Sequence, residues 1–326
     1  MYNPTTTIKK ASGNGQRKEK SARIGFFLEL KKNKILFLMI APVLIYFVVF
    51  SYLPMVGVYF AFTRFNFNDG LFGSPFVGFK NFKFLFDTGT LLYLTKNTIL
   101  YNIAFILLGN SLSITVAILL SRVANKTFKR LTQSFMFFPF FISYVIVNTF
   151  SYAMLNSGTG VFTRLLASVG IENFNAYSTP GIWKYIIVSV YLWKTLGYGT
   201  VIYLAAITGI SDEYYEAAQV DGATIFQQVR YITIPLLVPT FIILLLLAIG
   251  GILRGQFELF YQLVGSNGQL FEATDILDTY VFRMLRVTFD LGIGAAAGLY
   301  QSLFGLVLIL TVNYVIRKYQ EDYALF

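Results

Sequence analysis

The sequence predicts an all-α, polytopic membrane protein with six transmembrane helices, and three observations lead to this fold class. First, 56% of the 326 residues are hydrophobic and only 13% are charged, whereas soluble domains carry about 25% charge. Second, several apolar stretches reach the roughly 20 residues that a helix needs to cross a bilayer. Third, basic residues gather in the segments that would lie on one side of that bilayer.

The predicted spans are long apolar segments separated by polar or mixed ones. They cover approximately residues 35–60, 97–120, 134–155, 183–207, 234–253 and 291–316. The apolar part of the first is too long for a signal peptide and no small-residue cleavage site follows it, so we expect it to remain as a span. An even number of spans places both termini on the same side.

The distribution of basic residues predicts which side that is. The tail before Ile35 holds nine Lys or Arg against Glu19 and Glu29. The loop Arg122–Arg130 has four basic residues and no acid, and Arg317 with Lys318 closes the last span. All three regions fall on one side, which the positive-inside rule assigns to the cytoplasm. We therefore expect both termini to be cytoplasmic and loops 62–96, 156–180 and 255–290 to be external.

The chain is expected to have two parts, a basic cytoplasmic tail (1–34) and a six-span domain (35–326). Near the end of the tail, apolar residues stand among basic ones and suggest a short helix on the membrane surface. These apolar residues are Ile24, Phe26, Phe27, Leu28 and Leu30. The basic cluster suits anionic lipid, and because no nucleic-acid-binding module is visible we expect no nucleic-acid partner.

Composition excludes several kinds of chemistry. The chain has no cysteine and no histidine, which removes disulfides, thiolate or imidazole metal sites, and catalytic centres that depend on Cys or His. No glycine-rich nucleotide-binding loop is present, so we expect this chain to bind no cofactor. In the last external loop, Glu272, Asp275 and Asp278 lack the spacing of an EF-hand, and we expect them on a solvated loop surface that is accessible to another protein.

The loop between the fourth and fifth predicted spans breaks the basic pattern of the cytoplasmic side. Ser211 can cap a short helix whose first turn holds Asp212 and Glu213, where acids favour the helix dipole. Gly222 permits a sharp reversal with a left-handed backbone. A second short helix is expected over residues 223–231, and Pro235 should begin the next span. The two short helices would form a compact knob in the cytoplasm.

At these residues the chain resembles the permease subunits of bacterial ABC importers. Their signature is Glu-Ala-Ala, three residues, Gly, nine residues, Ile-x-Leu-Pro. This chain matches it at Glu216, Ala217, Ala218, Gly222, Ile232 and Pro235. Ile234 stands in place of leucine, a conservative departure. The resemblance implies a coupling loop over 208–235 that contacts the ATPase through Glu216, Ala217, Ala218, Asp221, Gly222 and Pro235.

Other stretches extend the resemblance over nearly the whole chain after the tail. Those at residues 41–54, 73–79, 203–206 and 275–281 look like the maltose-type carbohydrate permeases, and the chain is most similar to the LplB-like polysaccharide permeases of Gram-positive bacteria. This resemblance implies an alternating-access importer of an oligosaccharide in the cell membrane. It also implies three partners: a second permease forming a heterodimer, a cytoplasmic ABC ATPase dimer that binds ATP and Mg²⁺, and an extracellular solute-binding lipoprotein.

A path for sugar should offer aromatic faces for C–H surfaces and polar side chains for hydroxyls. Residues of these kinds occur in or near four spans: Asn148, Tyr152, Lys194, Gln256, Glu258, Tyr300, Gln301 and Ser302. Lys194 lies near the middle of a span, where a charge is costly, and a structural role at a helix interface is as reasonable for it as substrate contact. Gly294 and Gly298 form a GxxxG pattern, for which we expect close packing within the chain.

Two other classes of function are open at this point. A secondary transporter would need coupling carboxylates inside its spans, and the predicted spans show none. A membrane enzyme acting on lipid-linked sugars would need paired acids or a metal cluster near the interface, and the external acids form no recognisable pair. The importer therefore remains the preferred hypothesis, and we expect the chain itself not to be an enzyme.

Overall fold

The computed structural model describes residues 31–171 and 174–319. Within these ranges the chain is helical, and its one β feature is an isolated bridge between Thr63 and Phe76. The surface helix predicted from Ile24 to Leu30 lies outside the described residues. Residues up to Val56 and those from Gly57 onward form two compact units, which are described separately.

The described part of the first unit belongs to one apolar helical segment, residues 34–62, whose last residues lie in the second unit. It comprises α2 (Lys34–Phe47), a π-helical turn at Val48–Tyr52 and the beginning of a 3-10 segment, Leu53–Phe62. Pro42 lies inside α2. Together these 29 residues are long and apolar enough to cross a membrane, as predicted for the first span.

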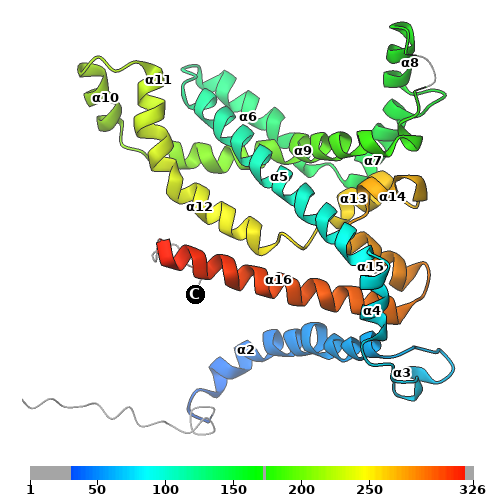
Figure 1. The fold of residues 1–326 in the computed structure, drawn as a ribbon. Coiled ribbons are helices and arrows are strands. Elements are labelled where there is room, and N and C mark those ends of the chain that lie inside the picture. The colour runs from blue at the N-terminus through cyan, green and yellow to red at the C-terminus, as the bar shows by residue number, and fades with distance from the viewer. Residues whose placement is uncertain (1–30, 172–173, 320–326) are drawn as a thin grey trace, which may run out of the picture. The chain divides into compact units, whose positions relative to one another are not determined.

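The second unit holds the other long helices (Figure 1). Three further spans of the expected kind are α5 (Thr90–Ser121), α9 (Pro180–Thr208) and α16 (Leu291–Tyr319). A fourth runs over Ile225–Gly250 and consists of α11 (Ile225–Gln228), a π-helical turn (Val229–Thr233) and α12 (Ile234–Gly250). With the first unit this gives five spanning helices among the described residues, and six when a bent pair is counted. The six-span, all-α prediction is confirmed.

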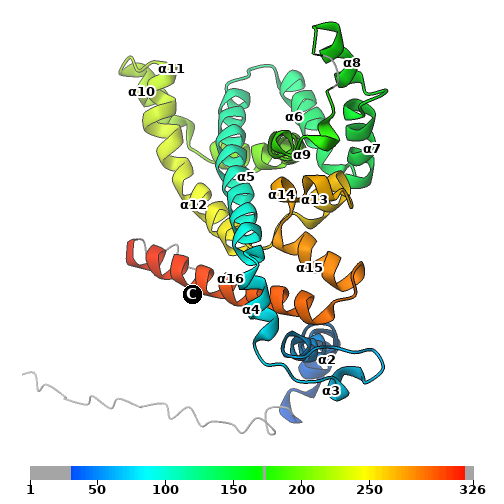
Figure 2. The same cartoon turned by 45° about the vertical axis from the view of Figure 1, so that its right-hand side comes forward.

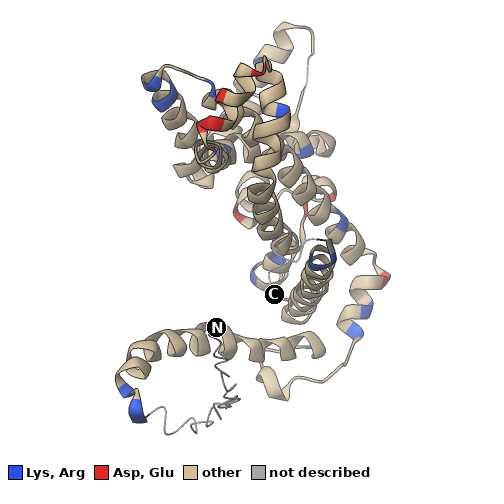
Figure 3. Ribbon diagram, turned by 90° about the vertical axis from the view of Figure 1, so that its left-hand side faces the viewer, with Lys and Arg blue, Asp and Glu red and all other residues tan. Residues whose placement is uncertain are grey.

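Short helices connect the spans. They are α3 (Gly70–Gly73), α4 (Lys80–Asp87), α8 (Val161–Ser168), η3 (Ala176–Ser178), α10 (Asp212–Val220), α13 (Phe257–Val264), η5 (Gly268–Leu270), α14 (Phe271–Thr274) and α15 (Leu277–Arg286). Lysine, arginine, aspartate and glutamate lie mostly at helix ends and in these connections, while the long helices are largely uncharged (Figure 3). This distribution suits spans in hydrocarbon, where an unpaired charge is costly.

The bent pair replaces the single third span predicted over 134–155. α6 (Lys126–Phe141) and α7 (Tyr144–Leu155) meet at an angle of 94°. Ser143 caps α7 by accepting a hydrogen bond from the Ile146 N–H, which starts a new helix in a new direction. The carbonyl groups freed at the end of α6 then need donors from elsewhere in the protein.

α9 is the central helix of this region and packs against both α5 and α6. Gly197 makes the approach of α6 possible, because a Cβ there would lie 2.0 Å from the Met136 carbonyl oxygen. On the α5 side, the buried Tyr203 hydroxyl donates to Asn110 Oδ1 at 2.6 Å. Small residues and interhelical hydrogen bonds are the usual means of helix association in membranes.

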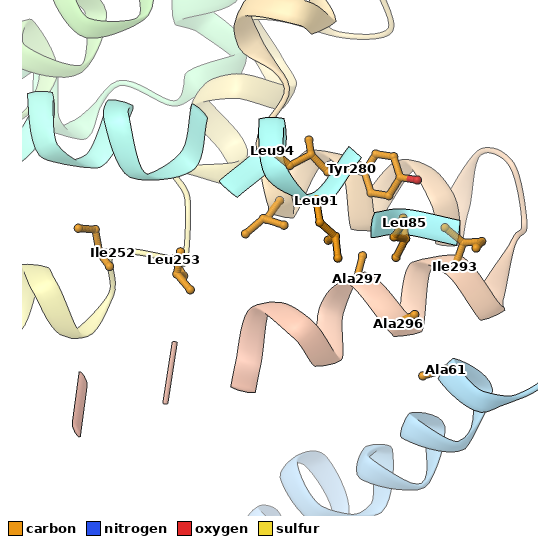
Figure 4. Packing of buried hydrophobic residues seen from close by; sticks show 11 residues of the cluster. Ala61, Leu85, Leu91, Leu94, Ile252, Leu253, Tyr280, Ile293, Ala296 and Ala297 are labelled. Atoms are coloured by element: carbon orange, nitrogen blue, oxygen red, sulfur yellow. The ribbon is translucent and has the colours of Figure 1, made fainter. Parts of the chain in front are cut away.

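A second packing region joins α4, α5, α15 and α16. Leu85, Leu91 and Leu94 are fully or almost fully buried there against Ala296 and Ala297 (Figure 4). The GxxxG pair lies on the adjacent face of α16, where a Cβ on Gly294 would lie 2.6 Å from a Leu285 methyl group. Gly298 lies opposite Val281 of the same helix, α15. These glycines therefore serve packing within the chain, as the sequence analysis expects.

Candidate functional site

The 208–235 loop projects as a knob from one end of the second unit, with α10 and α11 beside each other (Figures 1 and 2). The Ser211 side chain accepts a hydrogen bond from the Glu213 N–H, and Asp212 and Glu213 occupy the first turn of α10 as predicted. Glu216 and Ala217 are exposed on this helix, while Ala218 is half-buried.

The reversal after α10 depends on Gly222, whose φ is +77°. The Ala223 N–H donates to the Ala218 carbonyl at 2.8 Å and the Gly222 N–H to the Gln219 carbonyl at 3.0 Å. These two bonds form a Schellman motif, which closes the helix and satisfies its last carbonyls. A side chain at Gly222 would meet open space, so the constraint on this residue is its backbone conformation and not crowding.

The part of the loop after Gly222, its second arm, differs from the predicted short helix. No separate short helix exists over 223–231; instead the fifth span starts at Ile225, where Thr224 and Gln227 form a capping box. Pro235 lacks an N–H and cannot bond to Tyr231 as an ordinary α-helix would require. The π-helical turn over Val229–Thr233 adjusts the hydrogen bonds in front of the proline and lets the helix continue.

The tip of the knob exposes apolar side chains. The exposed fractions are 88% for Val220, 65% for Ile225 and 73% for Phe226. Asp221 and Gly222, both exposed, lie between them in the chain. An apolar patch beside acidic residues is typical of a surface that another protein covers.

Lys194 is engaged with the break in the third span. Its Nζ donates to the carbonyl oxygens of Pro139 at 3.2 Å and Phe140 at 2.9 Å, and also to that of Ile142. The same Nζ lies 4.9 Å from the centre of the Tyr144 ring. A cation is favourable at the negative end of α6, and the bonds satisfy carbonyls freed by the bend. Of the two roles considered for Lys194, the geometry supports the structural one.

A groove lies beside the middle of α16 and has a volume of about 680 Å³. Glycines form part of its wall, and its polar lining comes from Arg254, Asp278, Gln301 and Ser302. Gln301 Nε2 donates to the Leu253 carbonyl at 2.6 Å and to Asp278 Oδ1 at 2.9 Å. The other oxygen of Asp278 accepts from the Gly255 N–H. Burial raises the pKa of the Asp278 carboxyl, and these two hydrogen bonds oppose the shift.

The other residues that the sequence predicts for the sugar path do not lie at this groove. Tyr300 points to another side of α16, where its hydroxyl is 3.0 Å from Thr95 Oγ1. Asn148 is half-buried and Tyr152 exposed on α7. Gln256 and Glu258 lie at the start of α13, where Glu258 is exposed. The structure therefore joins Gln301 and Ser302 in one groove and leaves the other candidates outside it.

The external acidic residues do not form the solvated surface that we expected. Asp275 is only 2% exposed and is paired with Arg283. It also accepts hydrogen bonds from the Tyr93 hydroxyl at 3.2 Å and the Thr279 hydroxyl at 2.7 Å. Since Asp278 is engaged as described above, Glu272 alone of the three is exposed. Among the described residues no group of three or more acidic, His or Cys side chains could hold a metal ion.

Sequence reasoning missed two residues of the groove. Arg254 directly follows the fifth apolar segment, and this position at the end of a span was a usable signal. The local pattern around Asp278 predicts a solvated loop, because nothing in it shows that α15 turns this residue toward α16. The sequence identifies Arg122 only as a positive charge, whereas its side chain contacts the 208–235 loop.

The chain belongs to the family of binding-protein-dependent transport system inner membrane components, which matches residues 109–321. This membership confirms the resemblance to ABC importer permeases and the expectation of a transport subunit in place of an enzyme. Permeases of this type pair with another permease and an ATPase, and the six-span, multi-pass membrane arrangement agrees with the family.

Individual relatives agree with this assignment. The chain is 34% identical to "Protein LplB" of Bacillus subtilis over 92% of its length and 93% of the relative. It is 33% identical to the "Polygalacturonan/rhamnogalacturonan transport system permease protein YteP" of the same organism, with 94% of both chains covered.

Solved structures give the same result. One similar chain comes from a bacterial ABC transporter involved in the import of the acidic polysaccharide alginate, with a TM-score of 0.81, 31% identity, and coverage of 90% of this chain and 99% of that one. A second is from the alginate transporter in complex with an alginate pentasaccharide-bound periplasmic protein, with a TM-score of 0.79, 31% identity, and coverage of 90% of this chain and 97% of that one.

Proposed function

We propose that this chain is a permease subunit that carries an oligosaccharide into a bacterial cell, with ATP and Mg²⁺ bound by a separate ATPase. The observation that carries the proposal is the Glu-Ala-Ala-x-x-x-Gly segment, which folds into an exposed helix closed at Gly222. The family membership and the sugar-transport relatives support it. The cell membrane is the site of action, and a Gram-positive bacterium is the source that the Bacillus relatives favour.

The 208–235 loop is proposed as the coupling loop, which transmits ATPase motion to the spans. The knob contains Glu216, Ala217, Ala218, Asp221 and Gly222. Its exposed apolar tip offers a surface for a cleft of the ATPase. Pro235 acts more indirectly, because it lies beyond the π-helical turn at the root of the fifth span. This assignment requires the knob, both termini and the basic tail 1–34 to be cytoplasmic, with residues 35–326 forming the permease domain.

The groove beside α16 is proposed as part of the sugar path, with Gln301 and Ser302 facing it. Polar and charged groups beside the middle of a span generally line a water-filled cavity or face a partner. Both oxygens of Asp278 accept hydrogen bonds from this chain, and the nearby charge of Arg254 lowers the pKa of its carboxyl. Arg254 itself is exposed and lines the groove. A guanidinium group favours carboxylates, so an acidic oligosaccharide suits this groove, in agreement with the alginate and polygalacturonan relatives.

The test is uptake by the complete complex in proteoliposomes. This chain, its partner permease and the ATPase would be reconstituted, and the binding protein with labelled acidic or neutral oligosaccharides added outside. We expect uptake to require ATP inside the vesicles, where the ATPase is located. We also expect acidic oligosaccharides to be taken up in preference to neutral ones. Uptake driven by an ion gradient without ATP would instead establish the secondary transporter, and sugar-lipid turnover would establish the membrane enzyme.

A further inference from the structure

Arg122 lies where α5 ends and contacts both arms of the coupling loop. Its guanidinium carbon is 5.0 Å from the centre of the Tyr215 ring in α10. Its Nη1 donates to Gln228 Oε1 in α11 at 3.2 Å. One side chain therefore connects the end of the second span, α5, with α10 (called the coupling helix below) and with α11, the first turn of the fifth span.

The two groups that Arg122 contacts are themselves held in place. Gln228 is 3% exposed, and its Nε2 donates to the Ala223 carbonyl at 3.3 Å, just after the reversal at Gly222. The Tyr215 hydroxyl forms a 3.0 Å hydrogen bond with Thr233 Oγ1, and Thr233 is 1% exposed. Arg122 thus binds an ordered polar network and not a freely moving surface.

α10 has few other attachments to the spans. Of its nine residues, Asp212–Val220, only Tyr215 and Ala218 are half-buried, and the rest are exposed. A cleft of about 500 Å³ separates α10 from the ends of α5 and α9. It is lined by Ser121, Arg122, Thr208, Asp212, Glu216 and Gln219 among others. Tyr215, through its contacts with Arg122 of α5 and Thr233 of the fifth span, is therefore the main attachment of α10 to the spans.

We propose that Arg122 is a positioning residue that latches the coupling helix to α5, so that the second span moves with the coupling loop when the ATPase closes. The proposal rests on the coupling role given to this loop above. Without the latch, α10 could follow the ATPase while α5 stayed behind, and ATP would be hydrolysed with less sugar transported.

Arg122 also has a simpler role as a cation at the C-terminal end of α5, on the basic side of the membrane. Any basic residue would serve that purpose. A flat guanidinium that faces an aromatic ring and also donates to an amide oxygen is more specific, and lysine reproduces this arrangement only in part. The comparison of Arg122→Ala with Arg122→Lys therefore separates the two roles.

The experiment uses the complete transporter and two measurements. The first is the ratio of sugar transported to ATP hydrolysed in proteoliposomes. The second is the distance distribution between spin labels on Ala124→Cys, after α5, and Glu213→Cys, exposed in the first turn of α10 and away from the apolar tip. The chain has no native cysteine, so labelling is specific when the other subunits are also cysteine-free. Arg130→Ala, which removes the same charge from an exposed position early in the following helix, α6, is the matched control.

We expect Arg122→Ala to keep the ATPase attached and active while the transport ratio falls about fivefold, as loss of one cation–π contact and one charged hydrogen bond allows. The label distances should broaden. Arg122→Lys should give intermediate values, and Arg130→Ala should match the parent protein in both measurements.

The outcomes separate failure of the latch from failure of the proposed function. An unchanged ratio or an unchanged distance distribution in Arg122→Ala would overturn the latch. An effect of Arg130→Ala as large as that of Arg122→Ala would also overturn it, because charge alone would then be responsible. A further outcome is that the parent complex transports no oligosaccharide while the distance distribution between the labels still broadens in Arg122→Ala alone. The proposed substrate would then be wrong, but the attachment of α10 to α5 would stand.

Discussion

At the scale of single residues, Lys194 illustrates how a costly charge is used inside a membrane protein. Lys194 is 7% exposed, and its ammonium group donates to carbonyls at the end of α6. The neighbouring helix thereby supplies the donors that the bent third span lacks. These hydrogen bonds engage the ammonium group within the fold, which favours the structural role of Lys194 over sugar contact.

We expect Lys194→Met to destabilise the protein because it leaves buried carbonyls unpaired, at a cost of about 1–3 kcal/mol each. The thermal midpoint of the purified complex should fall by roughly 5 °C or more. Lys184→Met is the control, since Lys184 lies exposed on the same helix. Equal midpoints for the two variants would contradict the role given to Lys194.

Glu216 provides a residue-scale test of the knob. It is exposed on α10, so its carboxylate can pair with a basic group of the ATPase. Glu216→Gln keeps the shape of the side chain and should lower the affinity of the ATPase about two- to fivefold, the range for an exposed ion pair. Glu213→Gln, on the same helix, should have little effect. Affinity is measured by titrating the ATPase onto immobilised permease complex, and a larger loss in Glu213→Gln would contradict the assignment.

At the scale of helices, the long elements were predictable and their irregularities were not. The long apolar segments of the sequence predicted the spans. The glycine that follows the capped helix predicted a left-handed backbone conformation at Gly222. The bend between α6 and α7 was missed because residues 134–155 are apolar on both sides of it. Its donor, Lys194, comes from a different helix. The proline at position 235 suggested a helix start, whereas a π-helical turn carries the helix through it.

Close packing of α6 on α9 gives a helix-scale prediction. Gly197→Ala should reduce the yield and thermal stability of the complex, because its new Cβ would lie 2.0 Å from a backbone oxygen and the helices would have to separate. Gly181→Ala is a matched control on α9, where the Cβ meets open space. Alanine should favour the helix at both sites, by up to about 1 kcal/mol in its interior, so a loss of stability in Gly197→Ala alone points to the clash. Equal stability of the two variants would show that α6 does not approach α9 closely.

At the scale of the whole molecule, orientation in the membrane follows from charge. The loop Arg122–Arg130 and residues Arg317 and Lys318 place basic groups on the side where the knob projects. Reporters placed within 122–130 or after Phe326 should therefore be cytoplasmic, and reporters at Gly170 or Gly268 external. Single cysteines at these positions, labelled with a membrane-impermeant reagent on intact cells, provide a second reading because the chain has none of its own. A cytoplasmic Gly268 would contradict the six-span arrangement.

The placement of the path residues shows the limit of sequence reasoning at this scale. Gln301 and Ser302 were recognisable as polar groups in a span, and they do line a groove. Tyr300 is their neighbour in sequence but bonds to Thr95 on another side. Which face of a helix meets a cavity depends on the neighbouring helices, and in a protein rich in apolar residues the sequence alone distinguishes those faces poorly.

The most direct test of the central claim, that an ATPase drives transport through the 208–235 loop, compares two glycines. Gly222 and Gly170 both have positive φ, +77° and +89°, and a Cβ at either meets open space. Alanine at each therefore introduces similar backbone strain, about 1–2 kcal/mol, and only Gly222 lies in the loop. ATP-driven oligosaccharide uptake should fall about tenfold in Gly222→Ala, with assembly and binding-protein affinity unchanged, and remain near the parent rate in Gly170→Ala. Equal uptake by the two variants, with the ATPase firmly attached, would contradict the account.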